Sequence, residues 1–280
     1  MNIQLRTHAA VERAEAERER IEEKVAAFEE FGERVSEVSA DAGQQVGGAS
    51  GPTRSAGSAN SRRGQSGGSA LAGSAVAAGA TASGGTRATA DAAETVREAF
   101  AETVLPYADA DTLSEAMADE LSAELAAALS PAAGGFTPGL KGQLLSRVES
   151  RTKECGLLAD AIGTERDRIQ AVADELDAAT DWLAEADETP LLQLGFEELR
   201  ERHDRLAEFR ETCTRLAGER QSAVRGTQND GLTGIRESEL LDHLYADFED
   251  DHPVLADLAR LDDALADCQR AVRKHLCARV

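Results

Sequence analysis

The sequence has little lysine, few aromatic residues and no long apolar run. Only four of its 30 basic residues are lysine, and aromatic residues make up 4% of the 280 residues. No apolar run approaches the roughly 18 residues that a membrane-spanning helix needs. The N-terminus also lacks the charged, apolar and small-residue succession of a signal peptide. We therefore expect a cytoplasmic protein with no membrane role.

Basic charge is also scarce, because 52 acidic residues outnumber 30 basic ones and the formal net charge is -22. Nucleic-acid phosphates are bound by lysine and arginine, so direct binding of nucleic acid is not expected. In dilute buffer so many like charges would repel one another, whereas at about 1 M salt the screening length falls to about 3 Å. We interpret the acidity and the lysine depletion as adaptation of a halophilic protein to a salt-rich cytoplasm.

Motifs that carry chemistry are missing as well. The four cysteines form no CxxC pair, so free thiols are expected. The C-terminal histidines and cysteines lack the paired spacing of zinc ligands, and the acidic runs lack the glycine of a calcium-binding loop. No phosphate-binding or dinucleotide-binding loop occurs. We therefore expect no metal, no cofactor and no enzymatic activity.

Composition divides the chain into three zones, 1–38, 39–90 and 91–280. The first is rich in Glu, Arg and Ala and carries apolar residues at a spacing of seven: Ala14, Ile21, Phe28 and Val35. This spacing predicts one amphipathic coiled-coil helix, interrupted at Arg18 and Gly32. Its apolar stripe needs a partner to cover it, either within the chain or outside it.

The second zone holds 12 of the 24 glycines. Between Asp41 and Asp91 it contains no acidic residue and four arginines: Arg54, Arg62, Arg63 and Arg87. The zone has few large apolar side chains to bury, and their burial cannot offset the conformational entropy that the segment would lose on folding. We therefore predict a disordered Gly/Ser/Ala-rich linker.

The third zone, 91–280, returns to helical patterning and is predicted to form a helical bundle. A helix is expected from about Asp91 to Leu105. Thr112 and Glu115 then resemble a capping box that opens a single helix with leucine or methionine at every fourth position up to Leu129. Two further helices are expected after residue 238, the second beginning near Pro253.

The strongest pattern begins after Thr137-Pro138, which suit the cap and first position of a helix. Six residues lie seven apart without an intervening proline: Val148, Cys155, Ile162, Ile169, Leu176 and Leu183. The turn signals Thr189-Pro190 and Gly195 follow, and a second helix is expected to about Val224. A long antiparallel hairpin over 138–225 is therefore predicted, with the six residues as an interaction seam.

Several stretches resemble an uncharacterised haloarchaeal family of helical proteins with a domain of unknown function. One runs from Asp181-Trp182-Leu183 through Thr189-Pro190-Leu191 and on to His203-Asp204-Arg205-Leu206. Others are Val96-Arg97-Glu98-Ala99-Phe100, and Leu244-Tyr245 followed by His252-Pro253-Val254-Leu255. The resemblance implies an archaeal source and a helical fold, and it assigns no catalytic or binding residue.

The expected fold is thus all-α, and the expected function is a non-enzymatic coiled-coil interaction or scaffold protein. Its partner would be another protein or a second copy, bound through the helical seams. The alternative is a regulatory protein that acts at nucleic acid through a partner or through the Arg-bearing linker. An enzyme would need a cleft that brings His203 or His243 against an acid.

Overall fold

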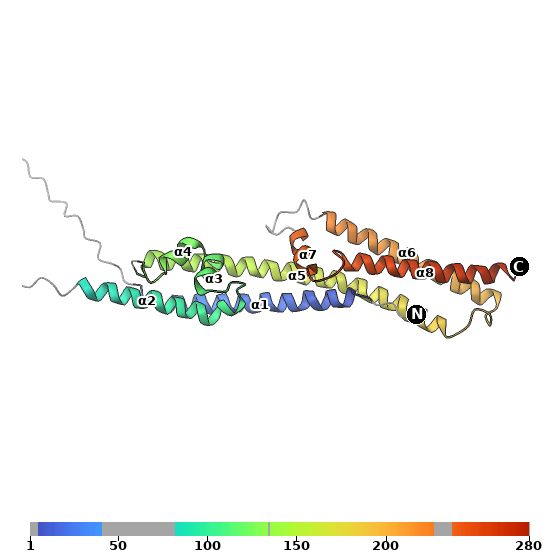
Figure 1. The fold of residues 1–280 in the computed structure, drawn as a ribbon, viewed down its shortest axis with the longest axis horizontal. Helices are drawn as coiled ribbons and strands as arrows, with labels where there is room; N and C mark the ends of the chain where they lie inside the picture. Colours follow the sequence, from blue (N-terminus) through green and yellow to red (C-terminus); the bar gives the residue numbers. More distant parts are fainter. Residues whose placement is uncertain (1–4, 41–81, 134, 227–236, 280) are drawn as a thin grey trace, which may run out of the picture. The chain divides into compact units, whose positions relative to one another are not determined.

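A computed structural model describes residues 5–40, 82–133, 135–226 and 237–279 (Figure 1). All the regular structure in these ranges is helical, so the all-α prediction is confirmed. The helices are α1 (Thr7–Glu37), α2 (Ala82–Thr103), α3 (Leu113–Glu120), α4 (Ala123–Ala128), α5 (Pro138–Asp187), α6 (Phe196–Gly226), α7 (Glu237–Tyr245) and α8 (Pro253–Cys277), with a 3-10 turn at Leu105–Tyr107. None of the described helices carries a stretch long and apolar enough to cross a bilayer. Most of the expected linker, at residues 41–81, lies outside the described residues.

The chain forms two compact units that do not coincide with the three compositional zones. Unit 1 comprises Met1–Ala27 and Ser150–Val280, and unit 2 comprises Phe28–Glu149. Helices α1 and α5 each contribute to both units. No change of composition marks the boundary, because it falls inside two continuous helices.

Unit 2 is built on phenylalanine. Phe28, Phe31, Phe100 and Phe136 are each fully buried. The rings of Phe31 and Phe100 meet edge to face with centroids 5.3 Å apart, a favourable arrangement for aromatic pairs. In this unit α1 runs antiparallel to α5, and Lys141 Nζ at the start of α5 donates to the carbonyl oxygens of Ser36 and Val38 at 2.7 and 2.8 Å.

One helix expected in unit 2 is two helices in the structure. The predicted hydrogen bond from Glu115 N to Thr112 Oγ1 is present at 3.3 Å, but α3 ends at Glu120. Ser122 is extended and caps α4 by accepting from Leu125 N at 3.1 Å. Arg147 Nε of α5 donates to the carbonyl of Leu121 at 2.7 Å, which satisfies an oxygen that a continuous helix would have used.

Helix α2 also departs from the expected boundary, since it begins at Ala82 and not near Asp91. The helix therefore extends into residues that composition assigned to the linker. Local propensity does not account for this extension, because Gly84 and Gly85 each disfavour a helix by about 1 kcal/mol relative to alanine.

Most of the predicted hairpin lies in unit 1, whereas the first turns of α5 belong to unit 2, and the bounds of the hairpin follow the prediction closely. Helix α5 starts at Pro138 with Thr137 Oγ1 accepting from Leu140 N at 3.2 Å, and α6 starts at Phe196. Helix α8 lies antiparallel to α6. Arg210 Nε of α6 donates to Asp262 Oδ1 of α8 at 2.9 Å, while Gln269 Nε2 donates to the carbonyl of His203 at 3.4 Å.

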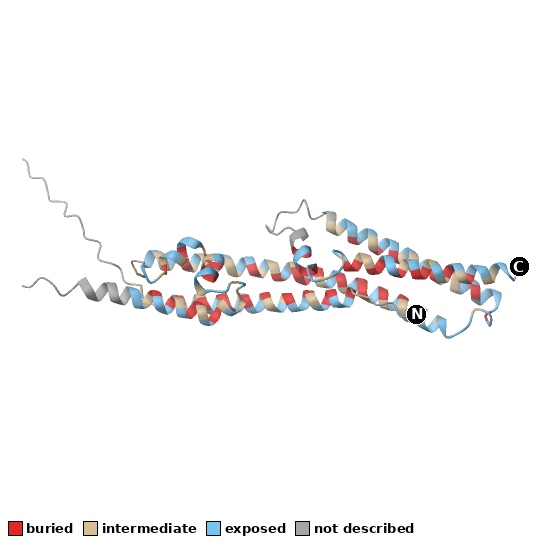
Figure 2. Ribbon diagram, in the orientation of Figure 1, coloured by how far each residue is buried: buried red, intermediate tan, exposed pale blue. Residues whose placement is uncertain are grey.

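The first part of α1 packs in unit 1, also antiparallel to α5. His8 Nε2 lies 3.0 Å from Asp177 Oδ2. The side chain of Arg18 lies over Gly163, with Arg18 Cδ 3.5 Å from where a β-carbon would stand. In unit 2, a β-carbon at Gly32 would stand 3.3 Å from Val148 Cγ1. Both interruptions of the α1 stripe are thus matched by a complementary residue on α5. The resulting buried stripes are visible in Figure 2.

Candidate functional site

The six seam residues of α5 differ in accessibility. Five have side chains at most 4% exposed, namely Val148, Cys155, Ile162, Ile169 and Leu176. Leu183, at the end of the helix, is half-buried. The chain's own helices therefore cover most of the seam, and only Leu183 is accessible to another molecule without opening the bundle. An interaction role for the whole seam stays a prediction.

A buried ionic cluster joins α5, α6 and α7 in unit 1. Glu165 Oε1 accepts from Arg220 Nη2 at 2.5 Å and from Tyr245 OH at 3.1 Å. Glu165 Oε2 accepts no hydrogen bond within the described residues, and Arg168 Nη1 lies 4.0 Å from it. Burial raises the pKa of the Tyr245 phenol well above its usual range. The phenol therefore stays protonated and donates to the carboxylate.

Sequence reasoning missed this cluster, although a signal was present. Glu165 stands three residues after Ile162, on the companion line of the heptad pattern, where Leu158 and Val172 also stand. A charged residue at a seam position is costly unless it is paired, so its presence indicates a buried partner. The identity of that partner, Arg220, depends on how α6 pairs with α5.

A second buried carboxylate holds the beginning of α1. Asp257 of α8 is 0% exposed. Its Oδ2 accepts from Arg6 N at 2.5 Å and from both N and Oγ1 of Thr7 at 2.8 Å. The first amides of a helix have no partner within the helix, so Asp257 caps α1 from a distant part of the chain. This contact fixes the N-terminal helix within unit 1.

The histidines and cysteines do not gather into one centre. His243 Nε2 lies 3.3 Å from Glu17 Oε1, and His203 Nδ1 lies 3.4 Å from Asp204 Oδ1. Both pairs lie outside the lining of the cavity described next. Within the described residues, no three His, Cys, Asp or Glu side chains come together as a metal site. The linker arginines Arg54, Arg62 and Arg63 lie outside the described residues.

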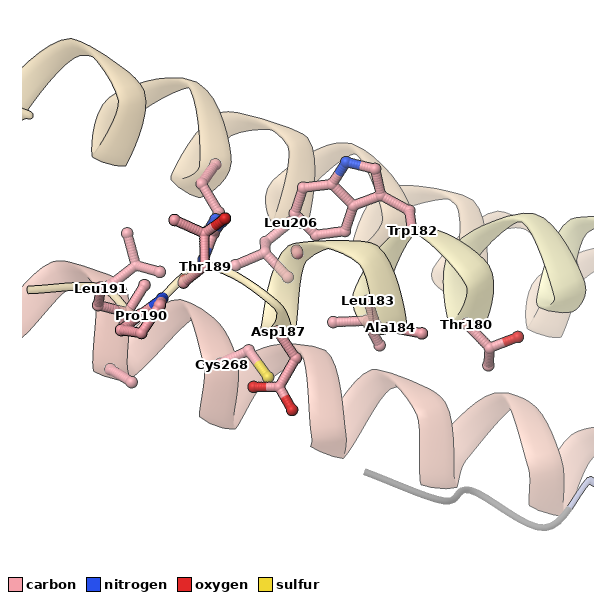
Figure 3. Close-up of a pocket in the computed structure, with 14 residues that line it drawn as sticks. Thr180, Trp182, Leu183, Ala184, Asp187, Thr189, Pro190, Leu191, Leu206 and Cys268 are labelled. Carbon is pink, nitrogen blue, oxygen red and sulfur yellow. The ribbon is translucent and has the colours of Figure 1, made fainter. Parts of the chain in front are cut away.

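A cavity of about 380 Å³ lies where α5 ends, between the start of α6 and the last turns of α8. Figure 3 shows the indole of Trp182 on the α6 side, beside Leu206, and the side chain of Asp187 directed toward Cys268. Most of the wall is apolar and comprises Trp182, Leu183, Leu191, Leu206 and Val272. Pockets of this size and composition suit an apolar group with a few polar neighbours.

Several side chains of the wall are constrained by their surroundings. Burial raises the pKa of the Cys268 thiol, and the Asp187 carboxylate raises it further, so the thiol is held neutral. Arg202 Nη1 donates to the carbonyl of Thr189 at 3.2 Å. Trp182 packs against Phe209 of α6 with ring centroids 5.5 Å apart, which fixes the indole in the wall.

The turn beside the cavity is held by Arg279, which follows the end of α8. The guanidinium of Arg279 donates to the carbonyl of Leu194, and its Nη2 donates to the carbonyl of Leu192 at 3.0 Å. The side chains of Leu192 and Phe196 remain 77% and 45% exposed. The turn is thus fixed by Arg279, and two apolar side chains at the turn and at the start of α6 face solvent without lining the cavity.

The sequence did not predict this cavity. Trp182 and the Thr189-Pro190 turn signal were visible, but Cys268 and Val272 enter the wall from a helix more than sixty residues away in sequence. Their placement depends on how α8 packs against the hairpin. The one usable signal was the single tryptophan of the chain next to a turn.

Comparison with known proteins gives a family and no function. No curated protein and no solved structure is significantly similar to the chain. Residues 5–269 match the model of a family described as a domain of unknown function, DUF7260. Because this match spans nearly all of the sequence, the chain belongs to the DUF7260 family.

Proposed function

We propose that this chain is a non-enzymatic helical interaction or scaffold protein of a haloarchaeal, salt-rich cytoplasm. It acts by binding another protein through an exposed end of its coiled-coil-like hairpin. The sequence suggested the whole seam of α5 as the interaction surface. We restrict the proposed surface to the exposed end of the hairpin, because the chain's own helices already cover the buried seam residues.

The observation that carries the proposal is where apolar side chains remain exposed. In the described part of the chain three large apolar side chains are exposed, Leu157, Leu192 and Phe196. Two of them belong to the α5–α6 turn, beside the cavity. Apolar residues grouped on an otherwise charged surface indicate a contact site more often than single ones do.

The test is association of the full chain at high salt. In about 3 M KCl, where charges are screened over about 2 Å, we expect the chain to self-associate or to retain a specific protein partner. Sedimentation and affinity purification from a high-salt lysate measure this. The double variant Leu192→Ser with Phe196→Ser should lose the association, whereas Leu157→Ser should keep it. A strict monomer that retains no partner contradicts the proposal.

A further inference from the structure

The cavity at the end of the hairpin has a largely apolar wall with a small number of polar side chains. Its volume of about 380 Å³ lies within the range of cavities that hold small molecules. Leu183, Leu191, Leu206 and Val272 give it an aliphatic lining, and the indole of Trp182 adds an aromatic face beside Leu206 (Figure 3). A wall of this kind suits the hydrocarbon part of a ligand.

The polar side chains of the wall differ in whether they already have partners. Thr180 Oγ1 donates within its own helix, at 3.0 Å from the carbonyl oxygens of Leu176 and Asp177. Asp187 already has a partner of its own. The raised pKa of Cys268 keeps its thiol neutral. These three side chains therefore present no unpaired charge to a ligand.

Arg202 is different, because it brings an unpaired positive charge to the wall. A guanidinium carries five N–H donors. Within the described residues Arg202 makes one hydrogen bond, from Nη1 to the carbonyl oxygen of Thr189 at 3.2 Å, and it forms no ion pair with a carboxylate there. This bond holds the guanidinium beside the cavity and leaves its other donors for a ligand. The group that matches a guanidinium best in charge and geometry is a carboxylate or a phosphate.

Exposed charges of both signs surround the cavity, so they do not select the charge of a ligand. Asp181 and Glu185 stand on α5, whereas Arg273 and Lys274 stand on α8. In about 1 M KCl surface charges act over about 3 Å. The charge of a ligand is therefore selected by the group that it contacts directly, which is the guanidinium of Arg202.

We propose that the cavity between α5, α6 and α8 binds a small amphipathic carboxylic acid. Its hydrocarbon part lies against the indole of Trp182, and its carboxylate accepts hydrogen bonds from the donors of Arg202 that Thr189 leaves unused. The wall removes the hydrocarbon from water, which favours binding. This inference goes beyond the proposed interaction function, whose residues Leu192 and Phe196 do not line the cavity.

Trp182 is the only tryptophan of the chain and lines the cavity, so its fluorescence reports on occupancy. The probe is decanoate, which does not absorb where tryptophan does, titrated into the full chain in about 1 M KCl. We expect a saturable change in the Trp182 emission with a dissociation constant of about 100 µM. Circular dichroism verifies that the helices persist. Unchanged emission up to about 5 mM decanoate overturns the proposal.

Matched probes separate the two parts of the ligand. Decylamine carries the same hydrocarbon chain with a cationic head, and it should bind at least about tenfold more weakly because its ammonium group meets Arg202. Butyrate keeps the carboxylate but has little hydrocarbon, so it should leave the emission unchanged up to about 5 mM. Decylamine that binds as tightly as decanoate contradicts the carboxylate assignment.

Two pairs of variants test the position of the ligand. Arg202→Gln should weaken decanoate binding by about tenfold and should not weaken decylamine, whereas Arg200→Gln, at an exposed position outside the wall, should change neither. Ala184→Phe fills the cavity from its wall and should abolish decanoate binding. Ala171→Phe, exposed on the same helix and outside the wall, should leave it intact. Unchanged decanoate binding in either Arg202→Gln or Ala184→Phe overturns the assignment.

The carboxylate end of a protein chain presents the same chemistry as a free acid, so a peptide separates the two sources. The peptide lacks tryptophan and ends in two leucines with a free carboxylate. Tighter binding of this peptide than of decanoate would assign the cavity to a protein terminus and overturn the small-molecule ligand. Failure of these tests leaves the proposed interaction function standing, because its variants at Leu192 and Phe196 lie outside the wall.

Discussion

The two compact units bury different chemistry. Unit 2 closes around four fully buried phenylalanines, with an edge-to-face pair at Phe31 and Phe100. Unit 1 closes around leucine, isoleucine and alanine, but it also buries the charged groups of Glu165, Arg220 and Asp257. Unit 2 also buries Glu120, and unit 1 also buries Phe209 and Tyr245, so the two units differ in which kind of buried group prevails.

The difference follows from the local geometry. Unit 2 contains the short helices α3 and α4, and aromatic rings supply a large buried area there. A long heptad seam offers nearly equivalent positions along its length, so an apolar seam alone specifies register weakly. A buried ion pair is satisfied in only one register, which makes it a device for specificity more than for stability.

We expect the largest loss of stability when a buried phenylalanine of unit 2 is truncated. Phe100→Ala should lower the free energy of unfolding by about 3–5 kcal/mol, because the ring leaves a cavity and Phe31 loses its edge-to-face partner. Denaturant unfolding at constant KCl measures this. Leu157→Ala, at an exposed position, should cost less than about 1 kcal/mol. Similar losses for the two variants would show that the phenylalanines do not dominate unit 2.

The next effect tests the ionic cluster of unit 1. Glu165→Ala should cost about 3 kcal/mol, because the positive charge of Arg220 stays buried without its carboxylate. The double replacement Glu165→Leu with Arg220→Met should recover most of that loss, since it removes both charges and keeps apolar volume. Equilibrium unfolding of the three proteins gives the comparison. A double variant as unstable as Glu165→Ala would mean that the pair itself stabilises the fold.

A smaller effect is expected at the start of α1. Asp257→Ala should cost about 1–2 kcal/mol, because the amides of Arg6 and Thr7 lose their acceptor. Hydrogen exchange should become faster in the first turn of α1 and change less elsewhere. Asp267→Ala, at an exposed position of the same helix, serves as the control. Unchanged exchange in α1 would contradict a capping role for Asp257.

The smallest effect concerns the thiols of unit 1. Burial, followed by the nearby Asp262 carboxylate, raises the pKa of Cys213 from its ordinary 9.0 to about 11. The folded state therefore keeps this thiol neutral while the unfolded state ionises, so its contribution to stability is present below about pH 9 and is lost toward pH 11. In timed alkylation followed by mass spectrometry, exposed Cys277 should react first and Cys213 slowly. Equal rates near pH 8 would contradict the burial of Cys213.

Local signals predicted the individual helices well and their breaks less well. Thr137-Pro138 and the uninterrupted heptads placed α5 at its observed start, because both the cap and the periodicity are local properties. The split between α3 and α4 was not predicted, since the leucines at every fourth position continue through Ser122. There the break depends on Arg147, which comes from another helix and binds the carbonyl of Leu121.

At the candidate site, too, local features were predictable from the sequence and long-range packing was not. The apolar character of Trp182, Leu183 and Leu191 next to a proline turn was evident in the sequence. The cavity itself needs Cys268 and Val272 from α8, and no local pattern links those residues to the turn. The seam residues were predicted as an interaction surface, whereas their burial depends on which of the chain's own helices cover them.

By itself the sequence determined that the chain is helical and acidic, and it determined where the long helices begin and turn. Hydrophobic periodicity and helix caps depend on residues only a few positions apart, so they can be predicted from the sequence alone. Tertiary structure alone decided that α1 and α5 contribute to two units, that Glu165 meets Arg220, and that Asp257 caps α1. Each of these depends on contacts between residues far apart in sequence, whose geometry is set only when the helices pack.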